Sequence, residues 1–235
     1  MNSPLQGNGQ TSYNHAMDEL SLMQRIAVWA LPAIFAITVH EVAHGWMAQR
    51  LGDPTAMMLG RLTLNPIKHI DPVGTILVPL LLLMVSPFIF GWAKPVPVTW
   101  QNLKHPKRDM ALVAAAGPLA NLVMAVFWVV VLKLGVVIAG QFPWAATFLR
   151  YVGQAGVFIN LILMVLNLIP IPPLDGGRVL SGLLPGPLSW QLNRLESVGF
   201  IILIVLLVTG ILGKVMGPVV FALQSALYFL VGLRG

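Results

Sequence analysis

The chain contains no cysteine and very few charged residues. Without cysteine it can form no disulfide and offers no thiolate, so any metal must be held by His, Asp, Glu or water. Charged residues make up 9% of the chain and hydrophobic residues 57%, and the mean hydropathy is +0.83. A soluble protein of this length needs far more charge to cover its surface. The composition therefore predicts a polytopic membrane protein with the lipid bilayer as its main surroundings.

The excess of positive charge does not point to a nucleic-acid partner. The formal net charge is +6, but Lys and Arg fall between apolar segments. Basic residues in short loops of this kind set the orientation of a membrane protein. We therefore expect no nucleic-acid binding, and the charges say nothing about oligomeric state.

Apolar segments divide the chain into three parts. Residues 1–23 form a polar tail without the basic start and short apolar core of a cleaved signal peptide. Residues 24–180 form the expected membrane-embedded core, and 181–235 the C-terminal membrane segments. The expected spans are 22–49, in which Pro32 can introduce a kink, then 109–134, 148–168 and 196–212, and a last segment, 215–233, broken by Gly217 and Pro218. The predicted fold is an all-α bundle of about four to six transmembrane helices with a small re-entrant β/loop element near the active site.

Two segments between the first and second long spans are ambiguous. Residues 57–64 are too short for a span and favour a strand, and Pro95–Val98 is expected to be extended. Residues 73–92 are apolar but interrupted by prolines, so they either cross the bilayer or re-enter and return. Re-entry would put nine loop Lys and Arg on one side and three on the other, whereas a full crossing would give seven and five. The positive-inside rule favours re-entry, with the end of the first span on the cytoplasmic side.

The sequence His40-Glu41-Val42-Ala43-His44 lies inside the first span. Residues four apart share one helix face, so both imidazoles can bind one zinc ion, and Glu41 can take a proton from water. The alternative is that the histidines are merely packed in a helix. Against it, these three are the only ionisable residues between Arg25 and Arg50. A carboxylate at membrane depth costs at least ~2.5 kcal/mol, which makes a functional role the default.

A catalytic zinc needs a third protein ligand, and Asp175 is the strongest candidate. It follows an apolar segment that ends in three prolines, and two glycines come directly after it. Irregular backbone at membrane depth is tolerated where it lines a cavity. As alternatives, Asp175 is a turn residue or a helix cap, and His69, Asp71 or His105 supplies the third ligand from a polar loop.

With both motifs, the chain resembles the site-2 protease family of intramembrane zinc metalloproteases. That family combines a membrane HExxH, here His40 to His44, with a later N-x-x-P-x-x-x-x-D-G, here Asn167 to Gly176. Ala116 to Asn121 is similar to its G-P-x-x-N helix start, and Gly91 to Pro95 to its membrane-associated loop. The resemblance implies one zinc ion per chain on His40, His44 and Asp175, with Glu41 as catalytic base and Asn121, Asn167 and Pro170 as supporting or substrate-binding residues. No stretch resembles a PDZ or CBS domain, so we expect the compact form of the family.

The resemblance also implies a function and a location. The expected activity is hydrolysis of peptide bonds within or near transmembrane segments of membrane proteins, as in regulated intramembrane proteolysis. The expected location is a bacterial-type cytoplasmic membrane, with the active site toward the cytoplasm. Two alternatives are a metal-ion transporter or sensor, which would carry further ionisable residues in other spans, and a catalytically inactive scaffold, which would have lost Glu41 or a ligand.

Overall fold

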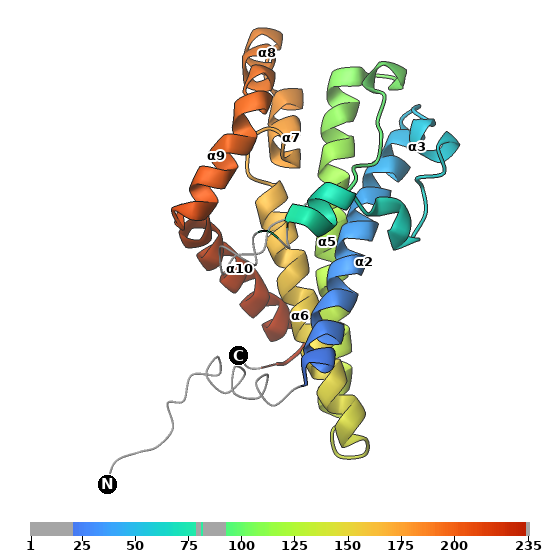
Figure 1. Cartoon of the computed structure of the whole chain (residues 1–235), viewed down its shortest axis with the longest axis vertical. Helices are drawn as coiled ribbons and strands as arrows, with labels where there is room; N and C mark the ends of the chain where they lie inside the picture. The colour runs from blue at the N-terminus through green and yellow to red at the C-terminus, as the bar shows by residue number, and fades with distance from the viewer. Residues whose placement is uncertain (1–20, 79–80, 82–92, 234–235) are drawn as a thin grey trace.

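The computed structural model describes residues 21–78, 81 and 93–233, and within these residues the chain forms helices and no β-strand (Figure 1). Four helices are long: α2 (Leu22–Arg50), α5 (Pro106–Val137), α6 (Pro143–Asn167) and α10 (Ile211–Leu230). Seven are short: α3 (Thr55–Met58), η1 (Pro66–His69), η2 (Pro72–Leu77), η3 (Trp100–Asn102), α7 (Asp175–Leu183), α8 (Gly186–Arg194) and α9 (Glu196–Val208).

Local sequence explains where the long helices begin. Ser21 and Gln24 form a reciprocal capping box that satisfies free backbone N–H groups at the start of α2. Pro106 and Pro143 occupy the first turns of α5 and α6, where the missing N–H has no helical partner to lose. Pro32 lies inside α2 without ending the helix.

The core lies between α5 and α6, which run side by side with α2 along the long axis of the molecule (Figure 1). Trp128 and Val129 of α5 are buried against Val157 and Leu161 of α6. The helices approach closely at Gly156, where a Cβ atom would lie 2.2 Å from the Trp128 ring. Small residues at helix contacts allow this close approach in membranes.

The four long helices are each apolar and long enough to span a membrane, and α8 with α9 forms a further apolar pair bent by 58°. The protein is thus an all-α polytopic bundle, and the expected spans 22–49, 109–134 and 148–168 are confirmed. Helix α9 covers most of the expected span 196–212, but it forms a bent apolar pair with α8 instead of one straight helix. The break expected at Gly217 and Pro218 is wrong, because α10 continues through both residues.

The strand expected at 57–64 is also wrong. Thr55–Met58 forms the helical turn α3, and the chain then turns at Gly60, which has a positive φ of 62°. The side chain of Asp53 accepts the Thr55 N–H, an interaction that starts a helical turn rather than a strand. Pro95–Val98, which was expected to be extended, belongs to no helix and no strand.

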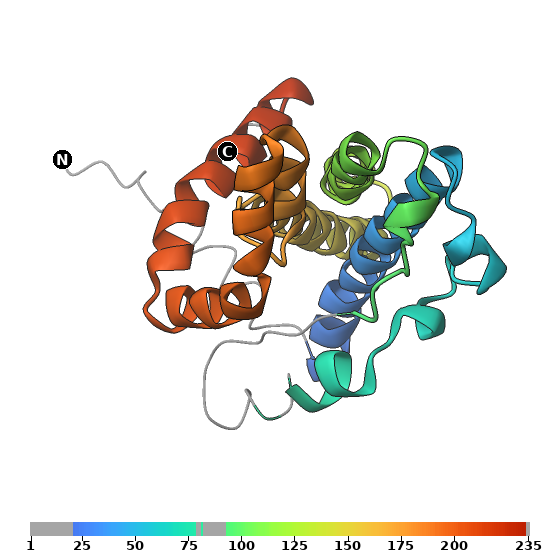
Figure 2. The same cartoon turned by 90° about the horizontal axis from the view of Figure 1, so that it is seen from above.

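The connection from α2 to α5 starts and ends at the same end of the bundle. The backbone N–H of Lys104 donates to the carbonyl of Leu51, at 3.1 Å, directly after α2 and directly before α5. A single full crossing by residues 73–92 would put these two positions on opposite sides of the membrane. Most of 73–92 lies outside the described residues, so this conclusion rests on the two ends. Figure 2 shows this connection on the α2 side of the bundle, with α9 and α10 on the other side.

Candidate metal centre

Three side chains from two separate elements meet inside the bundle. His40 and His44 lie one turn apart on α2, and Asp175 is the first residue of α7. The two Nε2 atoms are 3.0 Å apart, and Asp175 Oδ2 lies 3.2 Å from that of His40 and 3.3 Å from that of His44. Among the residues that the structure describes, only this group has three or more candidate ligands close enough to share a metal ion.

The other candidate ligands have different neighbours. His69 is buried with its Nε2 atom 2.9 Å from the Thr63 carbonyl. Asp71 accepts backbone N–H groups at the start of η2, and His105 occupies the N-cap position of α5 without a capping hydrogen bond from its side chain. None of the three belongs to the cluster at His40.

The loop after α6 brings Asp175 to the histidines. Helix α6 ends at Asn167, and the chain turns through the proline-rich segment 168–174 before α7 begins. The turn is tight at Gly177, where a Cβ atom would lie 2.4 Å from the backbone N of Pro172. Glycine is therefore required at this position, two residues after the candidate ligand, and α7 packs against α5 to hold the turn in place.

Backbone contact fixes the tautomer of His44. Its Nδ1 atom lies 2.7 Å from the carbonyl oxygen of Val113, which can only accept a hydrogen bond. Nδ1 must therefore carry the hydrogen and donate it. In the neutral ring this leaves a lone pair on Nε2, the atom that faces Asp175.

A chain of buried amides fixes His40 in the same way. Asn160 Nδ2 donates to the Gly156 carbonyl, so Asn160 Oδ1 is the atom that accepts from Asn121 Nδ2, at 3.0 Å. Asn121 Oδ1 then faces His40 Nδ1 at 2.6 Å and accepts its hydrogen. The Nε2 atom of His40 is left with a lone pair, which also points toward Asp175.

These donor atoms fit a zinc ion. Asp175 Oδ2 is buried and accepts no hydrogen bond from the described residues, and both neighbouring Nε2 atoms present lone pairs to it. Three electron-pair donors this close together, on the buried His40 and Asp175 and the partly buried His44, repel one another unless a cation lies between them. Two imidazoles and one carboxylate form a ligand set typical of catalytic zinc, with a fourth position for water.

Helix α5 approaches the two histidines closely at Gly117, whose missing side chain leaves the space between the imidazoles free. A Cβ atom at Gly117 would lie 2.4 Å from His44 Nε2 and 2.6 Å from His40 Cε1. Any side chain at residue 117 would therefore occupy the position between the imidazoles. Gly117 is thus part of the site as well as of the helix.

Glu41 points its carboxylate toward the segment 93–99. Its Oε2 atom accepts the backbone N–H of Val96 at 2.8 Å. One oxygen of the carboxylate is fixed in this way. The side chain is partly buried, beside the histidines on the same helix.

Of the other residues singled out in the sequence, Asn167 lies at the end of α6, where its Nδ2 atom donates to the Leu163 carbonyl, and Pro170 is exposed in the loop that follows. The sequence did not single out Val113, and Gly117 entered only through the stretch 116–121 that resembles the G-P-x-x-N helix start. Asn160 stands out in the sequence only as a polar residue in the apolar span 148–168. Every residue type has a backbone carbonyl, so the sequence cannot show that the carbonyl of Val113 binds His44.

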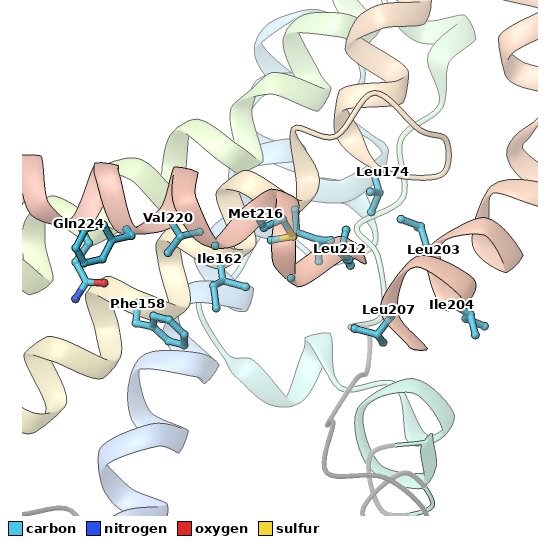
Figure 3. A pocket seen from close by; sticks show the side chains of 14 residues that line it. Phe158, Ile162, Leu174, Leu203, Ile204, Leu207, Leu212, Met216, Val220 and Gln224 are labelled. Atoms are coloured by element: carbon cyan, nitrogen blue, oxygen red, sulfur yellow. The ribbon is translucent and has the colours of Figure 1, made fainter. Parts of the chain in front are cut away.

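An apolar cavity of about 520 Å³ lies between α6, α9 and α10 (Figure 3). Among its lining residues are Phe158, Ile162, Leu203, Leu207, Met216 and Val220. Leu174, the residue before Asp175, also lines it. The described residues that line it include no carboxylate and no imidazole, so they offer no path of ion ligands.

Comparison with known proteins identifies the class. Residues 134–209 match the model of a family described as Peptidase family M50, a range that includes Asn167 and Asp175. The chain is 40% identical over 207 residues to "Putative zinc metalloprotease YwhC" of Bacillus subtilis, across 86% of this chain and 89% of that protein. The chain therefore belongs to peptidase family M50, the site-2 protease family, and is a zinc metalloprotease.

Two further relatives have similar names. "Putative zinc metalloprotease Rip2" of Mycolicibacterium smegmatis is 34% identical over 190 residues, across 80% of this chain and 68% of that protein. "Putative zinc metalloprotease MJ0611" of Methanocaldococcus jannaschii is 33% identical over 91 residues, across 38% and 41%. No solved structure matches the chain.

Proposed function

We propose that the protein hydrolyses peptide bonds within or near transmembrane segments of membrane proteins. His40, His44 and Asp175 hold the zinc ion and Glu41 is the general base. The observation that carries this proposal is the convergence of three electron-rich ligand atoms within 3.3 Å, on two buried residues and one partly buried residue, in a bundle of apolar helices. If Arg50 marks the membrane surface, His44 and His40 lie about 9 and about 15 Å below it, at 1.5 Å per residue.

The chemistry follows from the positions of these side chains. A zinc ion bound by the three ligands supplies Lewis acidity, which activates water and stabilises negative charge on a carbonyl oxygen. Glu41 accepts the proton of the attacking water at the carboxylate oxygen that Val96 does not bind. It then delivers this proton to the amide nitrogen that leaves.

A substrate helix must unwind before cleavage, because its carbonyl groups are engaged in internal hydrogen bonds. The extended segment Pro95–Val98 is a place for the unwound chain to pair by β-addition, since it contacts Glu41 through Val96. In the described part of the chain, the backbone N–H of Val98 has no hydrogen-bond partner. We expect the Val98→Pro variant to cleave more slowly with unchanged zinc content, and normal cleavage would rule out pairing at this N–H.

The loop charges support an active site that opens toward the cytoplasm. Both ends of the connection between α2 and α5 lie at the His44 end of the bundle, together with the basic residues near them. The positive-inside rule then places this end on the cytoplasmic side of a bacterial-type cytoplasmic membrane. Residues 24–180 form the catalytic core in this arrangement, and 181–235 the C-terminal membrane segments.

The experiment is a cleavage assay in lipid vesicles. Purified wild-type protein and the Glu41→Gln variant are incubated with peptides that carry one apolar span of about 20 residues, some with Gly or Asn inside the span. The proposal predicts cleavage inside or next to the span by wild type alone, and loss of cleavage when zinc is chelated. Cleavage by Glu41→Gln at the wild-type rate would contradict the role of Glu41. A wild type that binds zinc but cleaves no peptide would favour the inactive scaffold.

A further inference from the structure

The segment 93–99 is anchored at its first residues by Arg61 and His69. The buried guanidinium of Arg61 donates from Nη2 to the Lys94 carbonyl at 2.8 Å. The Lys94 N–H donates to the His69 carbonyl at 2.9 Å. These contacts fix the segment just before Val96, the residue that binds Glu41.

The other end of the segment is anchored by Asp53. This carboxylate is fully buried, and its Oδ2 atom accepts the backbone N–H of Thr99 at 2.7 Å. Its Oδ1 atom accepts the Thr55 N–H and Asn102 Nδ2, both at 3.1 Å, and the Thr55 hydroxyl. The two oxygens therefore have separate partners, and Oδ2 alone binds Thr99.

Asp53 is also tied to the helix that carries Glu41. Its backbone N–H donates to the Ala48 carbonyl in the last turn of α2, at 2.9 Å. Because α2 is continuous from Glu41 to Arg50, Asp53 has a fixed position relative to the general base. The Asp53 carboxylate thus sets the position of Thr99 with respect to Glu41, while Arg61 and His69 hold the other side of Val96.

The segment packs directly on α2. A Cβ atom at Gly45 would lie 2.8 Å from Val96 Cγ1 and 3.1 Å from the Cβ of Ala56. Gly45 therefore gives Val96 the space to reach Glu41. A small outward shift of the segment would break the hydrogen bond from Val96 to Glu41 while leaving the three metal ligands in place.

We propose that Asp53 is a positioning residue for Glu41: it holds Thr99 so that the Val96 N–H stays on Glu41 Oε2 and the other oxygen stays free for proton transfer. This inference rests on the proposed role of Glu41 as general base. An Asp53 that only capped α3 would need its bonds to Thr55 alone. The bonds to Thr99 and Asn102, which lie 46 and 49 residues away, serve the segment beside Glu41.

The Asp53→Asn variant tests this anchor with almost no change in size. The three donors around Oδ1 keep the amide oxygen on their side, so the new NH₂ group faces the Thr99 N–H. Two donors then meet and the contact to Thr99 is lost. We expect kcat for a cleaved single-span peptide to fall about ten- to a hundredfold, because small misplacements of a catalytic group have effects of this size. KM and zinc content should stay close to wild type.

Hydrogen–deuterium exchange gives a readout that does not depend on cleavage. Pro95 and Pro97 have no N–H, so a peptide covering 95–99 reports only the amides of Val96, Val98 and Thr99. Asp53→Asn should speed exchange of this peptide and leave peptides from the middle of α5 unchanged. Wild-type exchange at 95–99 in the variant would overturn the anchor.

The matched control is Asp71→Asn, the same substitution at another loop aspartate that accepts backbone N–H groups, those of Val73 and Gly74. It should keep the wild-type kcat, and an equal loss there would overturn the specific role of Asp53. Val96→Pro removes the N–H itself. Adding Asp53→Asn to Val96→Pro should cause little further loss, because both changes break one interaction, whereas fully additive losses would contradict the proposal.

The outcomes separate this inference from the proposed function. If wild type cleaves the peptides and Asp53→Asn cleaves them equally well, the positioning role fails and the protease function stands. If wild type cleaves none of the peptides, the proposed function fails, and exchange at 95–99 still decides whether Asp53 anchors the segment.

Discussion

Asn121 decides which nitrogen of His40 is available to a metal. Its side chain is fully buried and bonded on both sides, to His40 and to Asn160 and the Ala36 carbonyl. A partner that holds the second nitrogen of a ligating histidine fixes both the tautomer and the direction of the ring. The hydrogen-bond network around the candidate metal centre thus extends from α2 into α5 and α6.

Removal of this amide should weaken zinc binding. We expect Asn121→Ala to raise the zinc dissociation constant about ten- to a hundredfold, the usual effect of losing such a partner. Competition with a chelator of known affinity measures this directly. Asn167→Ala is the control, since Asn167 bonds to a carbonyl of its own helix, and it should bind zinc as wild type does. Equal weakening in both variants would contradict the selective role of Asn121.

Asp53 should also leave a signature in the pH dependence of stability. Burial alone would raise the pKa of Asp53, but hydrogen bonds from Thr55, Asn102 and Thr99 outweigh it and hold the pKa below the ordinary 3.8. The ionised carboxylate therefore contributes stability that is complete above 3.8 and is lost as the pH falls through the lower folded value.

Thermal unfolding in detergent measures this contribution. Wild type should be more stable than Asp53→Asn near neutral pH, and the difference should shrink as the solution is acidified below 3.8. A difference that is constant over the whole pH range would mean that the charge of Asp53 contributes nothing.

At the scale of elements, the spans were predictable because apolar length is a strong signal and the bilayer imposes it. The same holds for His40 and His44, whose spacing of four residues alone puts them on one face of α2, with Glu41 beside them on the same turn. Asp175 was predictable from the prolines and glycines that end α6, although its contact with the histidines needed the structure. The structure of residues 57–64 was not predictable in this way. Their apolar side chains are typical of a strand, but the hydrogen bond from the Thr55 N–H to Asp53 starts a helical turn.

The turn between α6 and α7 gives a prediction of its own. Gly177→Ala would place a Cβ atom 2.4 Å from the backbone N of Pro172, so α7 must shift and carry Asp175 with it. We expect zinc to be lost while circular dichroism shows the wild-type helix content. Gly213→Ala is the control, because a Cβ atom there meets nothing within 4 Å. Full zinc in Gly177→Ala would contradict the link between this turn and the third ligand.

At the scale of the whole molecule, the absence of cysteine makes orientation measurable. A single cysteine at Lys104, near the His44 end of the bundle, or at Gln141, between α5 and α6 at the opposite end, has no native thiol as background. In intact cells, a membrane-impermeant thiol reagent should label Gln141→Cys and leave Lys104→Cys unlabelled until the cells are opened. The reverse pattern would put the active site on the outer side of the membrane.

The arrangement of the bundle also argues for a protease and against an ion transporter. The cavity between α6, α9 and α10 lies outside the metal centre. Its described lining is apolar except for Gln224. An ion path through the molecule would need further ligands along such a space. The described residues instead gather their ligands at one point, as a hydrolytic centre requires.

The most direct test of the account is the number of zinc ions per chain, measured by elemental mass spectrometry on detergent-purified protein prepared without chelators. Wild type should contain close to one zinc per chain, and both His44→Ala and Asp175→Ala should lose it. Zinc absent from wild type would contradict the metal centre as a whole. Zinc retained in Asp175→Ala alone would contradict the assignment of the third ligand.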